Sequence, residues 1–298
     1  MTKIRLSKLF LSAALALVFS VQAFAQQAAP APTPTGRAKL PTTVETLKLN
    51  SKLMAREMSY RVVLPGAYKN TGDAARFPVI YLLHGLGGHF NNWTDRTKLS
   101  EYASAYDFII VTPEGGDGWY SDSVSVPDDR FESYIVKELI PEIDTKFRTR
   151  TDRASRAIAG LSMGGYGAVK FGVKYPDKFI LAGSFSGAMG ITDLPAAAAQ
   201  FPSVKNVFGP DGSQNRKDND IFRIIRDTPA EKLKDLPFIY VACGTEDFLF
   251  SNNQDFMKLL SEKKVKHEYR QAPGAHMWPF WDDQVQEFLR LSERFFKK

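Results

Sequence analysis

The segment from Gly160 to Gly164, which reads Gly-Leu-Ser-Met-Gly, has the residue types and spacing of a serine nucleophile on a tight turn. An apolar run from Ala157 to Ala159 precedes it and a helix-compatible stretch from Tyr166 to Lys174 follows it. The sequence therefore predicts strand, sharp turn and helix, with Ser162 standing clear of the sheet. Glycine at both ends of the turn allows close approach to neighbouring backbone, because glycine has no Cβ. So short a pattern is a weak signal alone, and its partners must be found elsewhere in the chain.

A base is the first partner that such a serine needs, since a serine hydroxyl is a poor nucleophile near neutral pH. Of the four histidines, only His276 lies in a loop between a late predicted strand, residues 266–271, and the last predicted helix, residues 281–296. A neutral imidazole there could accept the proton of Ser162 and later deliver it to the leaving group. His276 is therefore the expected base.

A carboxylate that orients the base is the second partner. Asp247 lies just after the predicted strand 238–242, at the edge of a parallel sheet where catalytic groups gather. Glu246 is the alternative for this role. The order Ser162, Asp247, His276, each after a separate strand, is typical of α/β-hydrolases and differs from that of chymotrypsin-like and subtilisin-like proteases.

Acyl transfer also needs hydrogen-bond donors aimed at the oxyanion that develops in the transition state. The backbone N–H of Met163, at the start of the helix, is one expected donor. The glycine-rich turn from His84 to Gly88 follows a predicted buried strand, and the N–H of Leu86 is expected to be the other. His84 itself is interpreted as a hydrogen-bonded structural residue and not as a second base.

Predicted strands and helices alternate regularly along most of the chain. This pattern indicates an α/β fold with a mostly parallel central sheet covered by helices on both faces. An antiparallel start is expected at residues 45–49 and 54–64, with the turn at Asn50 and Ser51. The catalytic domain is predicted to span residues 44–298, with a small cap segment at about 188–236 over the active-site face.

The N-terminus carries the pattern of a secretory signal peptide. Lys3, Arg5 and Lys8 precede an apolar run, residues 9–21, and the small residues around Ala25 then favour cleavage after that position. A membrane anchor is the alternative, but the run is shorter than the roughly 18 to 20 residues that span a bilayer. Residues 26–43 are Ala/Pro-rich and are expected to form a flexible extension. The mature protein is thus expected outside the cytoplasm, secreted or periplasmic, with no membrane span.

Composition excludes several other functions. The net charge of +6 includes three positive charges of the expected signal peptide, and no Lys/Arg stripe alternates with aromatic residues, so no nucleic-acid partner is expected. Four histidines with no HExxH arrangement and the lone Cys243 argue against a metal site. A single cysteine also excludes an intramolecular disulfide. No phosphate-binding glycine-rich motif followed by lysine is present.

Several motifs together resemble one esterase branch of the α/β-hydrolases. That branch includes tributyrin esterase, S-formylglutathione hydrolase (esterase D), feruloyl and acetylxylan esterases, and the mycolyltransferases of the antigen 85 group. The resemblance covers roughly residue 44 to the C-terminus. The segments that carry it are residues 81–88, 119–123, 159–168, 184–187 and 243–249.

This resemblance implies a cofactor-free serine carboxylesterase with a triad at Ser162, Asp247 and His276 and oxyanion donors at Leu86 and Met163. It also implies that Trp119 and Tyr120 line the acyl or alcohol pocket, although a packing role in the core is the alternative for both. The expected substrate is a small-molecule or polysaccharide-linked ester of the short-chain or aromatic (acetyl or feruloyl) type. Two alternatives remain: an acyltransferase of the mycolyltransferase type, and an exported binding protein without chemistry.

Overall fold

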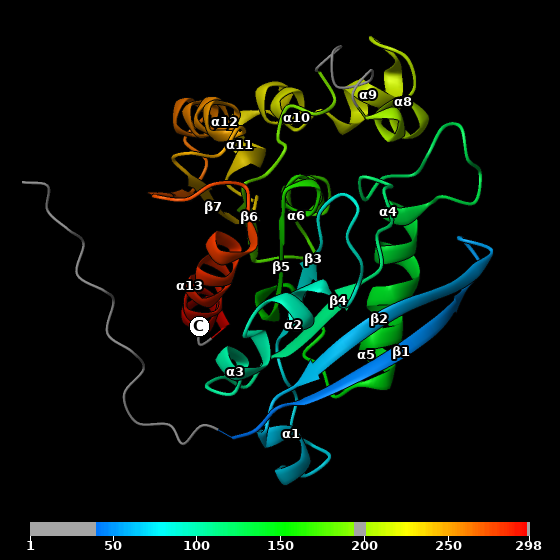
Figure 1. The fold of residues 1–298 in the computed structure, drawn as a ribbon, viewed down its shortest axis with the longest axis vertical. Helices are drawn as coiled ribbons and strands as arrows, with labels where there is room; N and C mark the ends of the chain where they lie inside the picture. Colours follow the sequence, from blue (N-terminus) through cyan, green and yellow to red (C-terminus); the bar gives the residue numbers. More distant parts are fainter. Residues whose placement is uncertain (1–39, 194–200, 297–298) are drawn as a thin grey trace, which may run out of the picture. The chain divides into compact units, whose positions relative to one another are not determined.

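The computed structural model describes residues 40–193 and 201–296, so the expected signal peptide and most of the extension lie outside the described residues. Its centre is an eight-stranded sheet with the order β1-β2-β4-β3-β5-β6-β7-β8 (Figure 1). β1 pairs antiparallel with β2 and β2 antiparallel with β4, whereas all later neighbours are parallel. The strands are β1 Thr43–Ser51, β2 Arg56–Leu64, β3 Val79–Leu83, β4 Ile109–Pro113, β5 Arg156–Leu161, β6 Leu181–Phe185, β7 Phe238–Gly244 and β8 His267–Ala272.

The central strands are apolar throughout because helices cover both of their faces. In β3, Val79, Tyr81 and Leu83 belong to one hydrophobic cluster, whereas Ile80 and Leu82 belong to a second cluster on the opposite face. This alternation follows from the two-residue period of a strand. The sheet therefore separates two cores and holds the carboxyl ends of its parallel strands at one edge, where the candidate site lies.

Each core is closed by its own helices (Figure 1). Residues of α4 and α5, α6 and α12 pack in the first core, and residues of α2, α3 and α13 pack in the second. The helices are α1 Ala67–Asn70, α2 Asn92–Arg96, α3 Leu99–Ala103, α4 Phe131–Tyr134, α5 Ile140–Lys146, α6 Met163–Lys174, α8 Pro202–Phe208, α9 Gln214–Asn219, α10 Ile221–Asp227, α11 Ala230–Leu233, α12 Phe250–Glu262 and α13 Trp278–Phe296. A π-helical segment, Ile135–Leu139, joins α4 to α5.

The fold is of the α/β class with a mostly parallel sheet, as predicted, and several local details differ. β1 extends through Ser51, so the hairpin turn lies at residues 52–55, where Ala55 has a φ of 48°. The short helix α2 was not expected. The segment 188–236, expected to be irregular, contains α8 to α11 in its described part.

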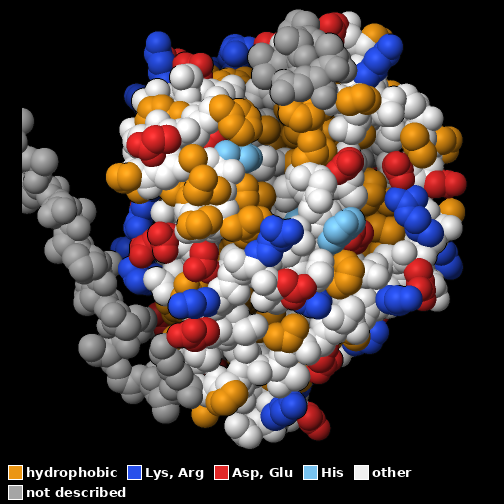
Figure 2. Space-filling view, in the orientation of Figure 1, with side chains coloured by type: hydrophobic (Ala, Val, Ile, Leu, Met, Phe, Trp, Pro, Cys, Tyr) orange, Lys and Arg blue, Asp and Glu red, His pale blue; other side chains and the backbone are white. Residues whose placement is uncertain are grey.

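The surface shows no broad area of one charge on the face drawn in Figure 2, where lysine and arginine side chains alternate with aspartate and glutamate. Among the helices of the described ranges, none combines the length and the apolar character needed to cross a membrane.

Candidate active site

Ser162 occupies a strained turn between β5 and α6. Its backbone has a φ of 52° and a ψ of −115°, a conformation that a side-chain-bearing residue rarely adopts. The glycines on either side are required sterically, because a Cβ on Gly160 would lie 2.5 Å from the carbonyl carbon of Gly164. A Cβ on Gly164 would lie 2.5 Å from the carbonyl oxygen of His84. The turn therefore holds Ser162 at the N-terminus of α6, facing a cavity.

A continuous hydrogen-bond chain joins Ser162 to two residues from later loops. Nε2 of His276 lies 3.0 Å from Oγ of Ser162. Nδ1 of His276 lies 2.9 Å from Oδ2 and 3.1 Å from Oδ1 of Asp247. The three residues that the sequence placed after separate strands thus meet at one edge of the sheet.

Asp247 is set up to stay ionised. Its side chain is fully buried, and burial alone would raise the pKa of its carboxyl group. The hydrogen bonds from His276 and from the backbone N–H of Leu249, at 2.8 Å, outweigh burial and lower that pKa. An ionised Asp247 accepts the Nδ1 proton of His276, which leaves Nε2 free to accept a proton from Ser162.

Glu246, the alternative acid, stabilises the loop before His276. Its carboxylate accepts hydrogen bonds from the backbone N–H of Gly274 and from the hydroxyl of Thr245. The bond from Gly274 is the main cause of its lowered pKa. Glu246 therefore contacts the loop that carries His276, whereas Asp247 contacts the imidazole itself.

The residues of the two expected oxyanion donors lie near Ser162: Met163 follows it in the chain, and Leu86 lines the same cavity. Among the described residues, neither the N–H of Leu86 nor that of Met163 has a hydrogen-bond partner. The neighbouring N–H of Gly87 donates to Oδ1 of Asp117 at 2.8 Å, which fixes the loop around Leu86. Both N–H groups therefore remain candidates for binding a ligand oxygen.

His84 is buried and fully engaged, in line with a structural role. Its Nδ1 lies 2.8 Å from the carbonyl oxygen of Gly85, and its Nε2 accepts a hydrogen bond from the N–H of Gly115 at 2.8 Å. Nε2 also lies 3.3 Å from Oε1 of Glu114. The ring has no contact with Ser162 that would make it a second base.

Trp119 and Tyr120 pack in the core. They are 2% and 0% exposed, and neither lines the cavity beside Ser162. The indole N–H of Trp119 donates to Oγ of Ser203 at 3.0 Å, and the hydroxyl of Tyr120 donates to the carbonyl oxygen of His84 at 3.0 Å. Both have positive φ, 50° and 51°, so this turn is strained.

The cavity beside Ser162 has a volume of about 260 Å³. No described residue of the segment 188–236 lines it. Sequence reasoning missed Asn92, Arg96, Trp278 and Trp281 in its wall, although two tryptophans within five residues of His276 were a usable signal. The lining residues are Gly85, Leu86, Gly87, Gly88, Asn92, Arg96, Leu161, Ser162, His276, Trp278 and Trp281.

Comparison with known proteins agrees with this geometry. A family model described as "Putative esterase" matches residues 51–291. The chain belongs to this esterase family. The family and the fold place this esterase in the α/β-hydrolase superfamily, and it is a hydrolase of carboxylic esters.

Relatives of the esterase act on several kinds of ester. It is 28% identical over 247 residues to an acetyl esterase of Caldicellulosiruptor saccharolyticus. This alignment covers 79% of this chain and 92% of the relative. A solved ferulic acid esterase superposes with a TM-score of 0.75 at 26% identity, covering 86% of this chain and 99% of that one. The fluorophosphonate-binding serine hydrolase FphF of Staphylococcus aureus superposes with a TM-score of 0.77 at 25% identity, covering 85% of this chain and 98% of FphF.

A transferase is also among the relatives. The diacylglycerol acyltransferase/mycolyltransferase Ag85A of Mycobacterium leprae is 26% identical over 279 residues, covering 82% of this chain and 81% of the relative. The family thus includes proteins named for hydrolysis and proteins named for acyl transfer.

Proposed function

We propose that this esterase is an exported serine carboxylesterase that cleaves short-chain or aromatic esters through an acyl-enzyme on Ser162. The observation that carries the proposal is the unbroken hydrogen-bond chain from Ser162 through His276 to Asp247, with the serine at a cavity wall. Each group has the role that its chemistry suits: nucleophile, general base and orienting carboxylate.

In the first half of the reaction, Oγ of Ser162 attacks the ester carbonyl carbon while Nε2 of His276 takes the hydroxyl proton. The ionised Asp247 stabilises the imidazolium that forms. Negative charge develops on the carbonyl oxygen, where the N–H groups of Leu86 and Met163 would bind it. The C–O bond then breaks, the alcohol leaves with the proton from His276, and the acyl group stays on Ser162.

In the second half, a water molecule gives its proton to His276 and attacks the acyl carbon, which releases the acid and restores Ser162. Cavity size supports a small substrate, since about 260 Å³ is below the usual range for drug-sized ligands. The tryptophan side chains that line the cavity suit a flat aromatic group as well as a short acyl chain.

The direct test is hydrolysis of p-nitrophenyl acetate and butyrate by the purified protein lacking residues 1–25. We expect turnover by the wild type, labelling by a fluorophosphonate probe, and loss of both in Ser162→Ala. An inert wild type that also resists the probe would contradict the proposal.

Transfer to an alcohol is the second candidate, and the similarity to Ag85A favours testing it. Hydrolysis and transfer share the same acyl-enzyme and differ only in whether water or an alcohol attacks it. Product analysis in the presence of a sugar or glycerol acceptor separates them, because a transferase forms the new ester faster than free acid.

Export rests on the sequence of residues 1–25. Mass spectrometry of the protein recovered from the medium or periplasm would locate its N-terminus, which we expect at Gln26. Retention of residues 1–25 in a membrane fraction would favour the anchor instead.

A further inference from the structure

We propose that the cavity beside Ser162 selects esters that also carry a carboxylate, and that Arg96 binds this second group. The inference rests on the proposed function of Ser162 and adds a substrate class to it. Arg96 is the one lining residue with a permanent charge, and none of the lining residues is a carboxylate. The cavity therefore offers a cation to a substrate without any acidic group to repel an anion.

The guanidinium of Arg96 is held in place but not neutralised. Its Cζ lies 5.7 Å from the ring centroid of Trp278. In the part of the chain that the structure describes, Arg96 forms no ion pair, and the adjacent Asp95 is taken up by Arg61 and Asn91. The planar donors of Arg96 are thus available to an incoming anion.

The Trp278 ring that lies beside this cation is itself held by packing. Its ring meets that of Trp93 edge to face at 5.5 Å and that of Trp281 at 5.3 Å. Trp93 is fully buried, and its indole N–H donates to the carbonyl oxygen of Leu83 at 2.9 Å. The tryptophan rings of α2 and α13 therefore hold the Arg96 side chain at the cavity.

Guanidinium is the side-chain group best suited to a carboxylate, because its two parallel N–H donors match the two oxygens. Arg96 is exposed to water, so the pair should contribute modestly. We therefore expect a preference that appears in KM and not an absolute requirement. A fold-change of about three to five is typical of one exposed ion pair.

The test uses ester pairs of one shape and two charges. Monoethyl adipate and ethyl adipamate place the carboxylate or its neutral amide in the acyl part, and 4-acetoxybenzoate and 4-acetoxybenzamide place it in the alcohol part. We expect the wild type to favour the anion about three- to fivefold in kcat/KM in at least one pair. Arg96→Gln should bring that ratio to about one, and 0.5 M NaCl should do the same in the wild type.

The matched control is Arg76→Gln, which removes an exposed charge next to the amino-terminal end of β3, away from the cavity, and should keep the wild-type ratio. A wild-type ratio of one in both pairs, or a ratio unchanged in Arg96→Gln, would overturn the inference. Failure of the proposed function would look different, because then the ester bonds of ethyl adipamate and 4-acetoxybenzamide would not be hydrolysed either.

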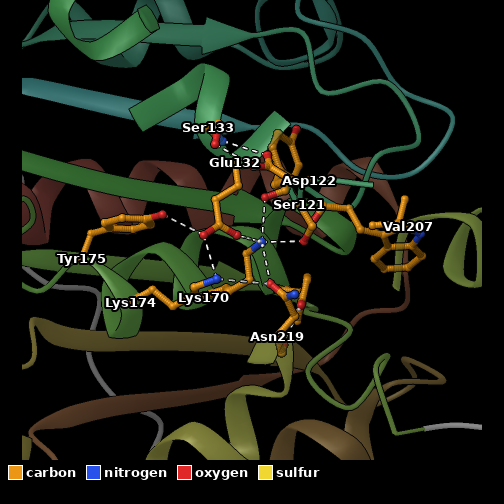
Figure 3. Close-up of polar contacts among 12 residues, drawn as sticks. Ser121, Asp122, Glu132, Ser133, Lys170, Lys174, Tyr175, Val207 and Asn219 are labelled. Carbon is orange, nitrogen blue, oxygen red and sulfur yellow. Dashed lines mark hydrogen bonds and ion pairs between the residues drawn. The ribbon is translucent and has the colours of Figure 1, made fainter. Parts of the chain in front are cut away.

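A second inference comes from an independent set of contacts. We infer that Lys170 is a positioning residue for the oxyanion loop and acts through Tyr120. Figure 3 shows the amine of Lys170 among acceptors from several segments. Its Nζ donates to the carbonyl oxygen of Tyr120 at 2.7 Å, to Oγ of Ser121 at 2.5 Å and to Oε2 of Glu132 at 2.7 Å.

Tyr120 links this buried cation to the loop beside Ser162. The bond from Lys170 holds the carbonyl of Tyr120 in a turn whose φ of 51° is unfavourable for a residue with a side chain. The hydroxyl at the other end of Tyr120 donates to the carbonyl oxygen of His84. Leu86, the expected oxyanion donor, is two residues further on. A shift of the Tyr120 turn would therefore move the donor.

The test compares two neighbouring lysines that share Glu132. Lys170→Met should lower kcat about 10- to 100-fold with KM within about twofold, since small misplacements near the reacting centre have effects of this size. Lys170→Arg should recover part of the loss. Lys174→Met is the matched control, because Lys174 also pairs with Glu132, at 2.7 Å, without touching Tyr120. Its kcat should stay within about twofold of wild type.

A folded Lys170→Met protein with wild-type kcat would overturn this inference. If Lys170→Met does not fold, Tyr120→Phe decides, because it removes only the bond to His84. We expect Tyr120→Phe to lower kcat about five- to tenfold with KM unchanged, since the misplaced oxyanion donor acts on the transition state alone. Wild-type kcat in a folded Tyr120→Phe protein would equally reject the link.

Discussion

Two hydrogen-bonded chains of charged groups are attached to opposite ends of α6, and they differ in access to water. At the N-terminal end, Ser162 joins His276 and Asp247, and the His276 side chain is 18% exposed. Near the C-terminal end, Lys170 joins Glu132, and the Lys170 side chain is 0% exposed. Both chains have short contacts and a buried carboxylate. Only the first opens into a cavity, and we call it the open chain. The second, Lys170 with Glu132, we call the sealed chain.

Access to water decides what each chain can do. A general base must gain and lose a proton in every turnover, so His276 needs the cavity as an entry and exit route. Lys170 is surrounded by protein acceptors and has no such route. Burial lowers the pKa of Lys170 to about 8, and Glu132 opposes this shift by stabilising the charged form. Near neutral pH Lys170 is therefore mostly charged, and its role is to orient backbone. The same helix thus carries a proton-transfer chain and a buried charge that supports the loops around it.

The largest expected effect is on the open chain. Ser162→Ala should lower kcat by at least about 10⁴-fold, because the acyl-enzyme can no longer form. The melting temperature should change little, since the hydroxyl faces a cavity. Esterase assays and thermal unfolding measure the two. Residual activity within a hundredfold of wild type would assign the nucleophile to another residue.

Within the same chain, Asp247 and Glu246 should differ sharply. Asp247→Asn should lower kcat about 10³- to 10⁴-fold because it favours the wrong tautomer of His276. Glu246→Gln is the matched control. It keeps most of the hydrogen bonding to the loop and should retain kcat within about tenfold. The reverse result, measured with p-nitrophenyl butyrate, would give Glu246 the acid role.

The sequence predicted the open chain better than the sealed one. Ser162, Asp247 and His276 each follow a strand and stand in short motifs, so their meeting point at the carboxyl edge of the sheet was predictable. The backbone of Tyr120 is held by a lysine about 50 positions away, which no local pattern indicates. Arg96 was missed because α2 is five residues long and too short to show a helical period.

On the sealed chain, the main effect should be on stability. Lys170→Met leaves Glu132 charged and partly unpaired in the interior, which typically costs ~3–5 kcal/mol of unfolding free energy. Adding Glu132→Gln should recover part of this loss, since the second charge is then gone as well. Urea unfolding of the two variants and the wild type tests this. A loss below about 1 kcal/mol would contradict a desolvated ion pair.

Acid should weaken the sealed chain in a defined pH range. Burial alone would raise the pKa of Glu132, but Lys170 and Lys174 outweigh it and lower the pKa to about 2 from an ordinary 4.5. A lowered folded-state pKa contributes stability that is present above pH 4.5 and lost as the pH falls toward 2. We expect about 2 kcal/mol of this contribution to be lost by pH 3. The stability gap between wild type and Glu132→Gln should narrow accordingly, and a gap that is constant from pH 6 to pH 3 would refute the assignment.

The smallest expected effect is that of Tyr175→Phe, which should change stability near Glu132 without changing catalysis at Ser162. Tyr175 donates its hydroxyl to Oε1 of Glu132 at 2.7 Å, but Glu132 keeps both lysines when that donor is removed. Tyr175→Phe should therefore cost only about 1 kcal/mol of unfolding free energy. Its kcat should equal that of wild type, because within the described chain the Tyr175 hydroxyl bonds to Glu132 and not to Tyr120 or the loop at residues 84–88. A fall in kcat without a fall in stability would mean that Glu132, and not Lys170 alone, transmits its position to the active site.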